Sequence, residues 1–99
     1  MNYSRLAQMT AKRIHNPGIN ARPVLNSVYV DVTPDADRTV KIQFGPGAGR
    51  GETHVEISLL DERKATLDTV GDAFDTNWAA TKAYSALFAA IEVWYPAAT

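Results

Sequence analysis

Two short runs decide the fold: residues 28–33 read VYVDVT, and residues 40–44 read VKIQF. In both runs every second residue is valine, isoleucine or phenylalanine, and the residues between them are polar, charged or tyrosine. One face of each extended segment is therefore apolar. Residues 34–37 between them read PDAD, a composition that favours a tight turn. The two runs therefore predict an antiparallel β-hairpin.

A third strand is expected after the glycine-rich stretch 45–51. Val55, Ile57 and Leu59 alternate with other residues, many of them polar, and predict a strand with one buried and one exposed face. This strand extends the hairpin into a meander whose apolar side chains share one face.

The segment 61–74 is ambiguous. The β-branched residues Thr66, Thr69 and Val70 favour a fourth strand over residues 65–70, ended by a glycine. The alternative is a short helix that collects its larger apolar side chains on one face. We expect the strand.

The first helix is expected over residues 3–15. Apolar side chains recur there at intervals of three and four, and residues 16–18, which read NPG, end the pattern. The stretch from there to about residue 26 is expected to be irregular, because Pro23 has no N–H group for strand pairing.

The second helix is expected from a cap at Asp75 or Thr76 to about Trp94. It is the only predicted element large enough to cover a sheet with one apolar face. The predicted fold is a single α+β domain over residues 1–99. It is a two-layer sandwich of an N-terminal helix, a three- or four-stranded antiparallel meander and a long C-terminal helix packed on the sheet.

The composition excludes several classes of function. The 99 residues include no cysteine, which excludes disulfide scaffolds and thiolate chemistry. Charged residues interrupt the longest apolar runs, and no apolar segment follows the N-terminus. We therefore expect a soluble cytoplasmic protein with no membrane partner and no small-molecule substrate.

Charge is distributed unevenly along the chain. The first 30 residues contain no acidic residue and carry a net charge of +4, whereas the rest of the chain carries −5. Such polarity is typical of a nucleic-acid-binding arm or of a surface that docks a protein. The alternative is a basic helix that packs beside an acidic sheet. The four positive residues are Arg5, Lys12, Arg13 and Arg22.

The second predicted helix is rich in aromatic residues. From Thr76 to Tyr95 only Lys82 and Glu92 are charged, and the apolar arc is wider than the roughly 100° that covering one sheet face requires. Either the first helix packs along the extra flank, or the flank meets another protein chain. We expect an interface. Its predicted aromatic residues are Trp78, Tyr84, Phe88, Trp94 and Tyr95.

Residues with catalytic or metal-binding chemistry form no convergent motif. Glu52, His54 and Glu56 share one strand face, but side chains two residues apart along a strand stand well separated. The aspartates of segment 31–37 lack the spacing of a calcium loop, and neither His54 nor His15 lies in a catalytic-triad context. We expect no enzymatic activity, no metal site and no cofactor.

The stretch 45–51 reads GPGAGRG and invites comparison with phosphate-binding loops. It lacks the Lys-Ser or Lys-Thr pair of a P-loop and the spacing of a dinucleotide-binding loop, and a strand rather than a helix is expected after it. We interpret it as a mobile hairpin connection with Arg50 exposed at its tip and available to a partner.

The order helix–three strands–helix, with an alanine-rich last helix, resembles the topology of double-stranded RNA-binding domains. Those domains place a lysine cluster at the start of the final helix, where this chain has Asp72, Asp75, Thr76 and Asn77, so no functional residue is transferred. In size and plain composition the chain is also similar to small phage-encoded assembly proteins and inhibitors.

The sequence thus predicts a non-enzymatic protein–protein interaction module. It either self-associates or docks on a larger partner through the aromatic helix and Arg50. The alternative is a nucleic-acid-binding domain that uses the basic N-terminal segment with Arg5, Lys12, Arg13 and Arg22.

Overall fold

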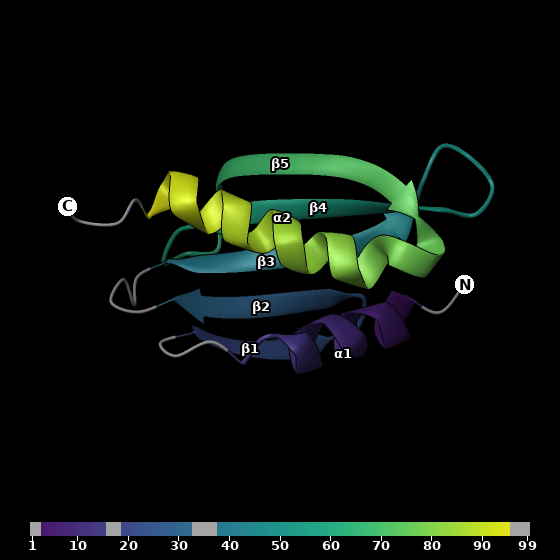
Figure 1. The fold of residues 1–99 in the computed structure, drawn as a ribbon. Coiled ribbons are helices and arrows are strands. Elements are labelled where there is room, and N and C mark those ends of the chain that lie inside the picture. Colours follow the sequence, from purple (N-terminus) through teal and green to yellow (C-terminus); the bar gives the residue numbers. More distant parts are fainter. Residues whose placement is uncertain (1–2, 16–18, 33–37, 96–99) are drawn as a thin grey trace.

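The computed structural model describes residues 3–15, 19–32 and 38–95, which form one antiparallel sheet with both helices on the same face (Figure 1). The sheet is a meander in the order β1-β2-β3-β4-β5. The predicted α+β two-layer architecture is confirmed, with five strands rather than three or four. The elements are α1 (Tyr3–Arg13), β1 (Ile19–Val24), β2 (Ser27–Val32), β3 (Thr39–Pro46), β4 (Glu52–Leu60), β5 (Thr66–Asp75), the short 3-10 helix η1 (Thr76–Trp78) and α2 (Ala79–Trp94).

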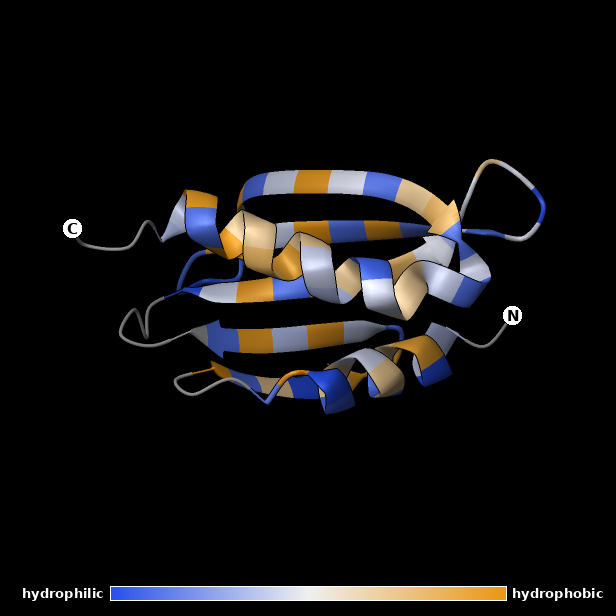
Figure 2. Ribbon diagram, in the orientation of Figure 1, coloured by the Kyte–Doolittle hydropathy of each residue, from blue (hydrophilic) through white to orange (hydrophobic). Residues whose placement is uncertain are grey.

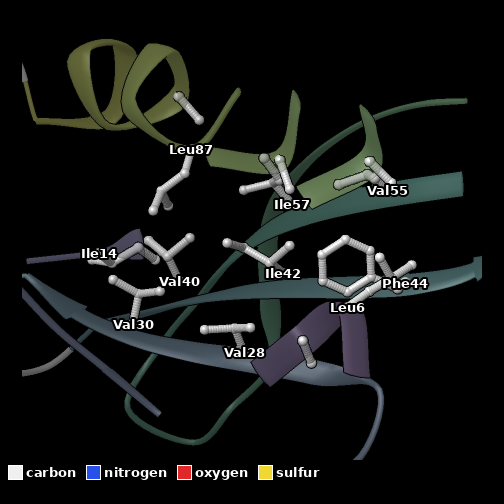
Figure 3. Close-up of a cluster of buried hydrophobic side chains, with 14 of the residues drawn as sticks. Leu6, Ile14, Val28, Val30, Val40, Ile42, Phe44, Val55, Ile57 and Leu87 are labelled. Atoms are coloured by element: carbon white, nitrogen blue, oxygen red, sulfur yellow. The ribbon is translucent and has the colours of Figure 1, made fainter. Parts of the chain in front are cut away.

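The buried layer follows from the alternation in β2, β3 and β4, which the hydropathy colouring makes visible (Figure 2). Val28 lies opposite Ile42, and Ile42 lies opposite Ile57, so their side chains project from the same face of the sheet. They meet Leu6 of α1 and Leu87 of α2 in one cluster (Figure 3). The predicted pairing of β2 with β3 is confirmed, while the predicted turn at residues 34–37 lies outside the described residues.

The two helices share the apolar face of the sheet. α1 packs on β1, β2 and β3, whereas α2 packs on β4 and β5. The expectation that the second helix alone covers the sheet is therefore wrong. Five strands at about 4.8 Å spacing span roughly 19 Å, and one helix is only about 10 Å wide.

α1 ends at Arg13, two residues before its predicted end. Leu6, Ala7 and Thr10 are buried, as their spacing predicts, and so is Ile14 just beyond the helix. The buried hydroxyl of Thr10 donates to the carbonyl of Leu6 at 2.8 Å, which satisfies the polar group inside the apolar layer.

Residues 19–24 form a strand, and the prediction of an irregular stretch is wrong there. β1 pairs with β2 over its full length, from Ile19 opposite Val32 to Val24 opposite Ser27. Pro23 is accommodated because β1 is an edge strand, which needs hydrogen-bond partners on one side only.

The prediction of a strand over residues 65–70 is confirmed, and β5 continues past Gly71 to Asp75. A register shift at Leu59/Leu60 accompanies its pairing with β4. Most of β5 is exposed, because α2 lies mainly over β4.

The second helix begins in two steps. Asp75 caps η1, since its Oδ1 accepts the N–H of Asn77 at 2.9 Å, and α2 itself starts at Ala79 without a side-chain cap. Its buried stripe of small residues and one leucine packs on the sheet. Within the described ranges, neither helix is long and apolar enough to cross a membrane.

Candidate functional site

Four of the five aromatic residues predicted to form an interface pack against the core of their own chain. Partly buried side chains there are those of Tyr84, Phe88, Trp94 and Tyr95. The ring centroids of Tyr84 and Phe88 lie 4.9 Å apart. Trp94 Nε1 donates to Asp68 Oδ2 at 3.0 Å, which ties the end of α2 to β5. Much of the wide apolar arc of α2 is thus used inside the molecule.

Replacing Trp94 by phenylalanine is expected to lower the free energy of unfolding by about 1 kcal/mol, because the smaller phenyl ring remains aromatic but cannot donate the hydrogen bond to Asp68. Urea denaturation measures the change. Trp78→Phe is the matched control, since Trp78 is 61% exposed. Equal destabilisation by both substitutions would contradict a structural role for the indole N–H of Trp94.

The four basic residues of the N-terminal segment are divided between two faces. Arg5, Lys12 and Arg13 are exposed on α1. Arg22 pairs with Tyr29, which alternates with the buried residues of β2, so it projects from the sheet face opposite the helices. Arg22 Nη1 lies 2.8 Å from Asp31 Oδ2.

A groove of about 370 Å³ lies between α1 and the start of α2. Its buried floor includes Leu6 and Ala80, and the 41%-exposed side chain of Met9 lies between Arg5 and Arg13 in the helical repeat. We call this surface the α1–α2 groove. It is lined by Arg5, Leu6, Met9, Arg13, Thr76, Asn77, Ala80 and Thr81.

Sequence reasoning missed Met9 as a site residue. The signal was present, because residues 5, 9 and 13 fall at four-residue spacing and form one stripe of a helix. The stripe alone does not predict a groove, because the other wall is formed by residues more than 60 positions away in the sequence, at the start of the second helix.

The sheet face opposite the helices, here called the open face, carries a hollow of about 500 Å³. Tyr29 lies between two cations: the guanidinium carbon of Arg22 is 5.8 Å from the ring centroid, and Lys41 Nζ is 5.9 Å from it. Lys64 also lines this hollow. Sequence analysis did not identify Tyr29, Lys41 or Lys64.

The edge of β5 has outward N–H groups that its own carboxylates occupy. The N–H of Thr76 donates to the carbonyl of Gly51, which directly precedes β4, at 2.8 Å. Because the direction of the N–H groups alternates along a strand, the N–H groups of Thr69 and Ala73 point away from β4, toward the free edge. Asp68 Oδ1 accepts the N–H of Thr69 at 2.9 Å. Asp72 Oδ1 accepts that of Ala73 at 2.8 Å.

The glycine-rich loop has a structural role. A Cβ atom at Gly47 would lie 2.8 Å from Cβ of Glu52 and 3.0 Å from its carbonyl carbon, so this position needs glycine, whereas a Cβ atom at Gly49 would meet only the flexible end of the Glu52 side chain. Gly47 also donates its N–H to the carbonyl of Glu52 at 3.2 Å. Arg50 is exposed, as expected, and its use by a partner stays a prediction.

Within residues 3–15, 19–32 and 38–95, no three histidine, aspartate or glutamate side chains gather to hold a metal ion. Glu56 and His54 lie on the open face of β4, and His15 is exposed beyond α1. Asp31 pairs with Arg22, whereas Asp35 and Asp37 lie outside the part of the chain that the structure describes.

Three surfaces therefore stand out: the α1–α2 groove, the open face and the β5 edge. Comparison of the chain with known protein families, with curated proteins and with solved structures finds no match. Function is accordingly inferred from the chemistry of these surfaces.

Proposed function

We propose that this chain is a non-enzymatic protein-interaction module whose α1–α2 groove docks an acidic, partly apolar segment of another protein. The observation that carries the proposal is the groove itself, in which exposed Met9 lies between Arg5 and Arg13 over a floor of Leu6 and Ala80. Apolar contact and positive charge are thus combined in one groove of the surface.

Charge complementarity favours an acidic partner. α1 contains Arg5, Lys12 and Arg13 and no acidic residue. These three cations outnumber the nearby acid Asp75, which precedes the groove residue Thr76 and accepts the N–H of Asn77. A carboxylate-bearing segment would meet charges of the opposite sign, which speeds encounter and fixes orientation.

The apolar side chains favour a protein over a nucleic acid as the occupant of this groove. Methionine adapts its shape to different partners, and exposed tryptophan is frequent at the energetic centre of interfaces. Trp78 is 61% exposed and directly follows the groove residue Asn77. Phosphate contacts, by contrast, need cations and gain little from an apolar floor.

Selection from a random peptide display library is expected to enrich peptides that combine acidic and apolar residues. Arg13→Glu should lower the affinity for the selected peptides about 10-fold or more, because it reverses a charge at the groove. Lys82→Glu makes the same charge change on the exposed side of α2 and should leave the affinity within about 2-fold. Isothermal titration calorimetry measures both.

Two results would contradict this proposal. One is enrichment of peptides without acidic residues, and the other is equal weakening by Arg13→Glu and Lys82→Glu. Light scattering of the wild-type chain, alone and with a selected peptide, shows whether the docked segment comes from a second copy. An oligomer that the peptide dissociates identifies self-association through the groove.

A further inference from the structure

The open face holds a straight row of side chains that crosses all five strands. Arg22 lies opposite Tyr29, and Tyr29 lies opposite Lys41. The row continues through Ser58 to Thr69, whose hydroxyl groups lie 3.0 Å apart. Directly paired residues project from the same face, so this row presents a cation, an aromatic ring, a second cation and two hydroxyl groups to one side.

Lys64 adds a third cation through a backbone conformation that is costly for lysine. Its φ angle is +66°, in the left-handed region that favours glycine. The loop that holds it is well defined, because Asp61 Oδ1 accepts the N–H groups of Arg63 and Ala65 at 2.8 and 2.9 Å. Lys64 Nζ reaches Thr39 Oγ1 at 3.1 Å, at the open face.

These side chains make the hollow locally positive. Lys41 and Lys64 line it against the acid Glu56, while Arg22, which also lines it, is paired with Asp31 on the same face. Glu56 lies opposite Gln43, one row away from Tyr29, where the two side chains offer hydrogen-bond acceptors and donors. The whole chain carries a net charge of −1, so the charge of this surface is opposite in sign to that of the whole chain.

We propose that the open face binds single-stranded nucleic acid, with a base stacked on Tyr29 and phosphates held by Lys41 and Lys64. Single strands are bound elsewhere by aromatic rings on which bases stack, set in a positively charged groove. The partly exposed ring of Tyr29 between two cations matches that chemistry. This surface is distinct from the α1–α2 groove, so either proposal can fail without the other.

Fluorescence anisotropy with labelled oligothymidine and oligouridine about eight nucleotides long tests the proposal at about 50 mM salt. Saturable binding is expected. Tyr29→Ala should lower the affinity about 5- to 150-fold, which corresponds to a stacking energy of about 1–3 kcal/mol. Tyr29→Phe keeps the ring and should stay within about 2-fold of wild type.

The cations are tested by the salt dependence of binding. Lys41→Ala should reduce the slope of log affinity against log salt by about 0.7, the value for one phosphate contact on a single strand. Lys64→Gly should weaken binding while the melting temperature stays equal to or above that of wild type, because glycine relieves the left-handed backbone. A purely structural role for Lys64 would not separate these two readouts.

Lys12→Ala is the matched control, because it removes a cation from α1 on the other side of the sheet. It should leave the affinity unchanged. The proposal is overturned if wild-type protein does not bind either oligonucleotide, or if Lys12→Ala weakens binding as much as Lys41→Ala. Equal competition by polyglutamate or by adenosine monophosphate would overturn it as well, since the former would show a surface that reads charge alone and the latter a site for free nucleotides.

Discussion

Replacing Phe44 by alanine is expected to lower the free energy of unfolding by about 3–5 kcal/mol. Phe44 is fully buried and is the largest of the buried side chains. It lies on β3 opposite Val55 and belongs to the cluster that joins the sheet to both helices (Figure 3). The loss would be a large part of the roughly 5–15 kcal/mol that stabilises a typical domain.

Equilibrium unfolding in urea, followed by circular dichroism, measures this loss. Val93→Ala is the control, because Val93 is 74% exposed on α2 and its truncation leaves no cavity. The control should change the free energy of unfolding by no more than about 0.5 kcal/mol. A loss below about 1 kcal/mol for Phe44→Ala would contradict the described core.

The central strands and α1 could be predicted because each shows its period within a short window. Val28 and Val30 alternate with exposed or half-exposed residues, and the buried residues of α1 recur at three- and four-residue intervals. A local period survives folding whenever one face of an element is buried and the other is not. β2, β3 and β4 meet that condition because the helices cover only one face of the sheet.

The edge strands were harder to predict because their burial pattern is weak. β1 contains Pro23 and is mostly exposed, so neither propensity nor alternation marks it as a strand. β5 is exposed over most of its length, and Gly71 lies inside it rather than at its end. Both strands are specified mainly by their neighbours β2 and β4, which offer free hydrogen-bonding edges in register.

The surfaces depend on residues that are distant in sequence. The α1–α2 groove joins Met9 to Ala80, and the hollow of the open face joins Arg22 to Lys64. No spacing rule relates such pairs, because their proximity follows from strand order. The charge asymmetry of the chain was visible in the sequence, but it could not show that Arg22 and Arg13 lie on different faces.

Replacing Asp72 by valine is expected to convert the chain into a self-associating one through β5. The substitution removes the carboxylate that accepts the outward N–H of Ala73 at 2.8 Å. It also removes a charge that would repel a second copy paired along the same edge. Valine favours extended structure, and residue 72 lies beside the apolar side chains of Val70 and Phe74, so folding stability should not fall.

Light scattering after size exclusion, between about 10 and 300 µM, should show a mass for Asp72→Val at least twice that of wild type at the same concentration. Asp72→Asn keeps a carbonyl acceptor for Ala73 and loses only the charge, so it should associate less than the valine variant. Glu92→Val is the matched control, because it removes an exposed acid from α2 and leaves β5 unchanged. Amide hydrogen exchange locates the contact, since new protection at Gly71 and Ala73 requires pairing along the β5 edge. If Asp72→Val stays monomeric, or if Glu92→Val associates equally, then Asp72 does not guard this edge and the hydrogen bond to Ala73 serves only the local strand conformation.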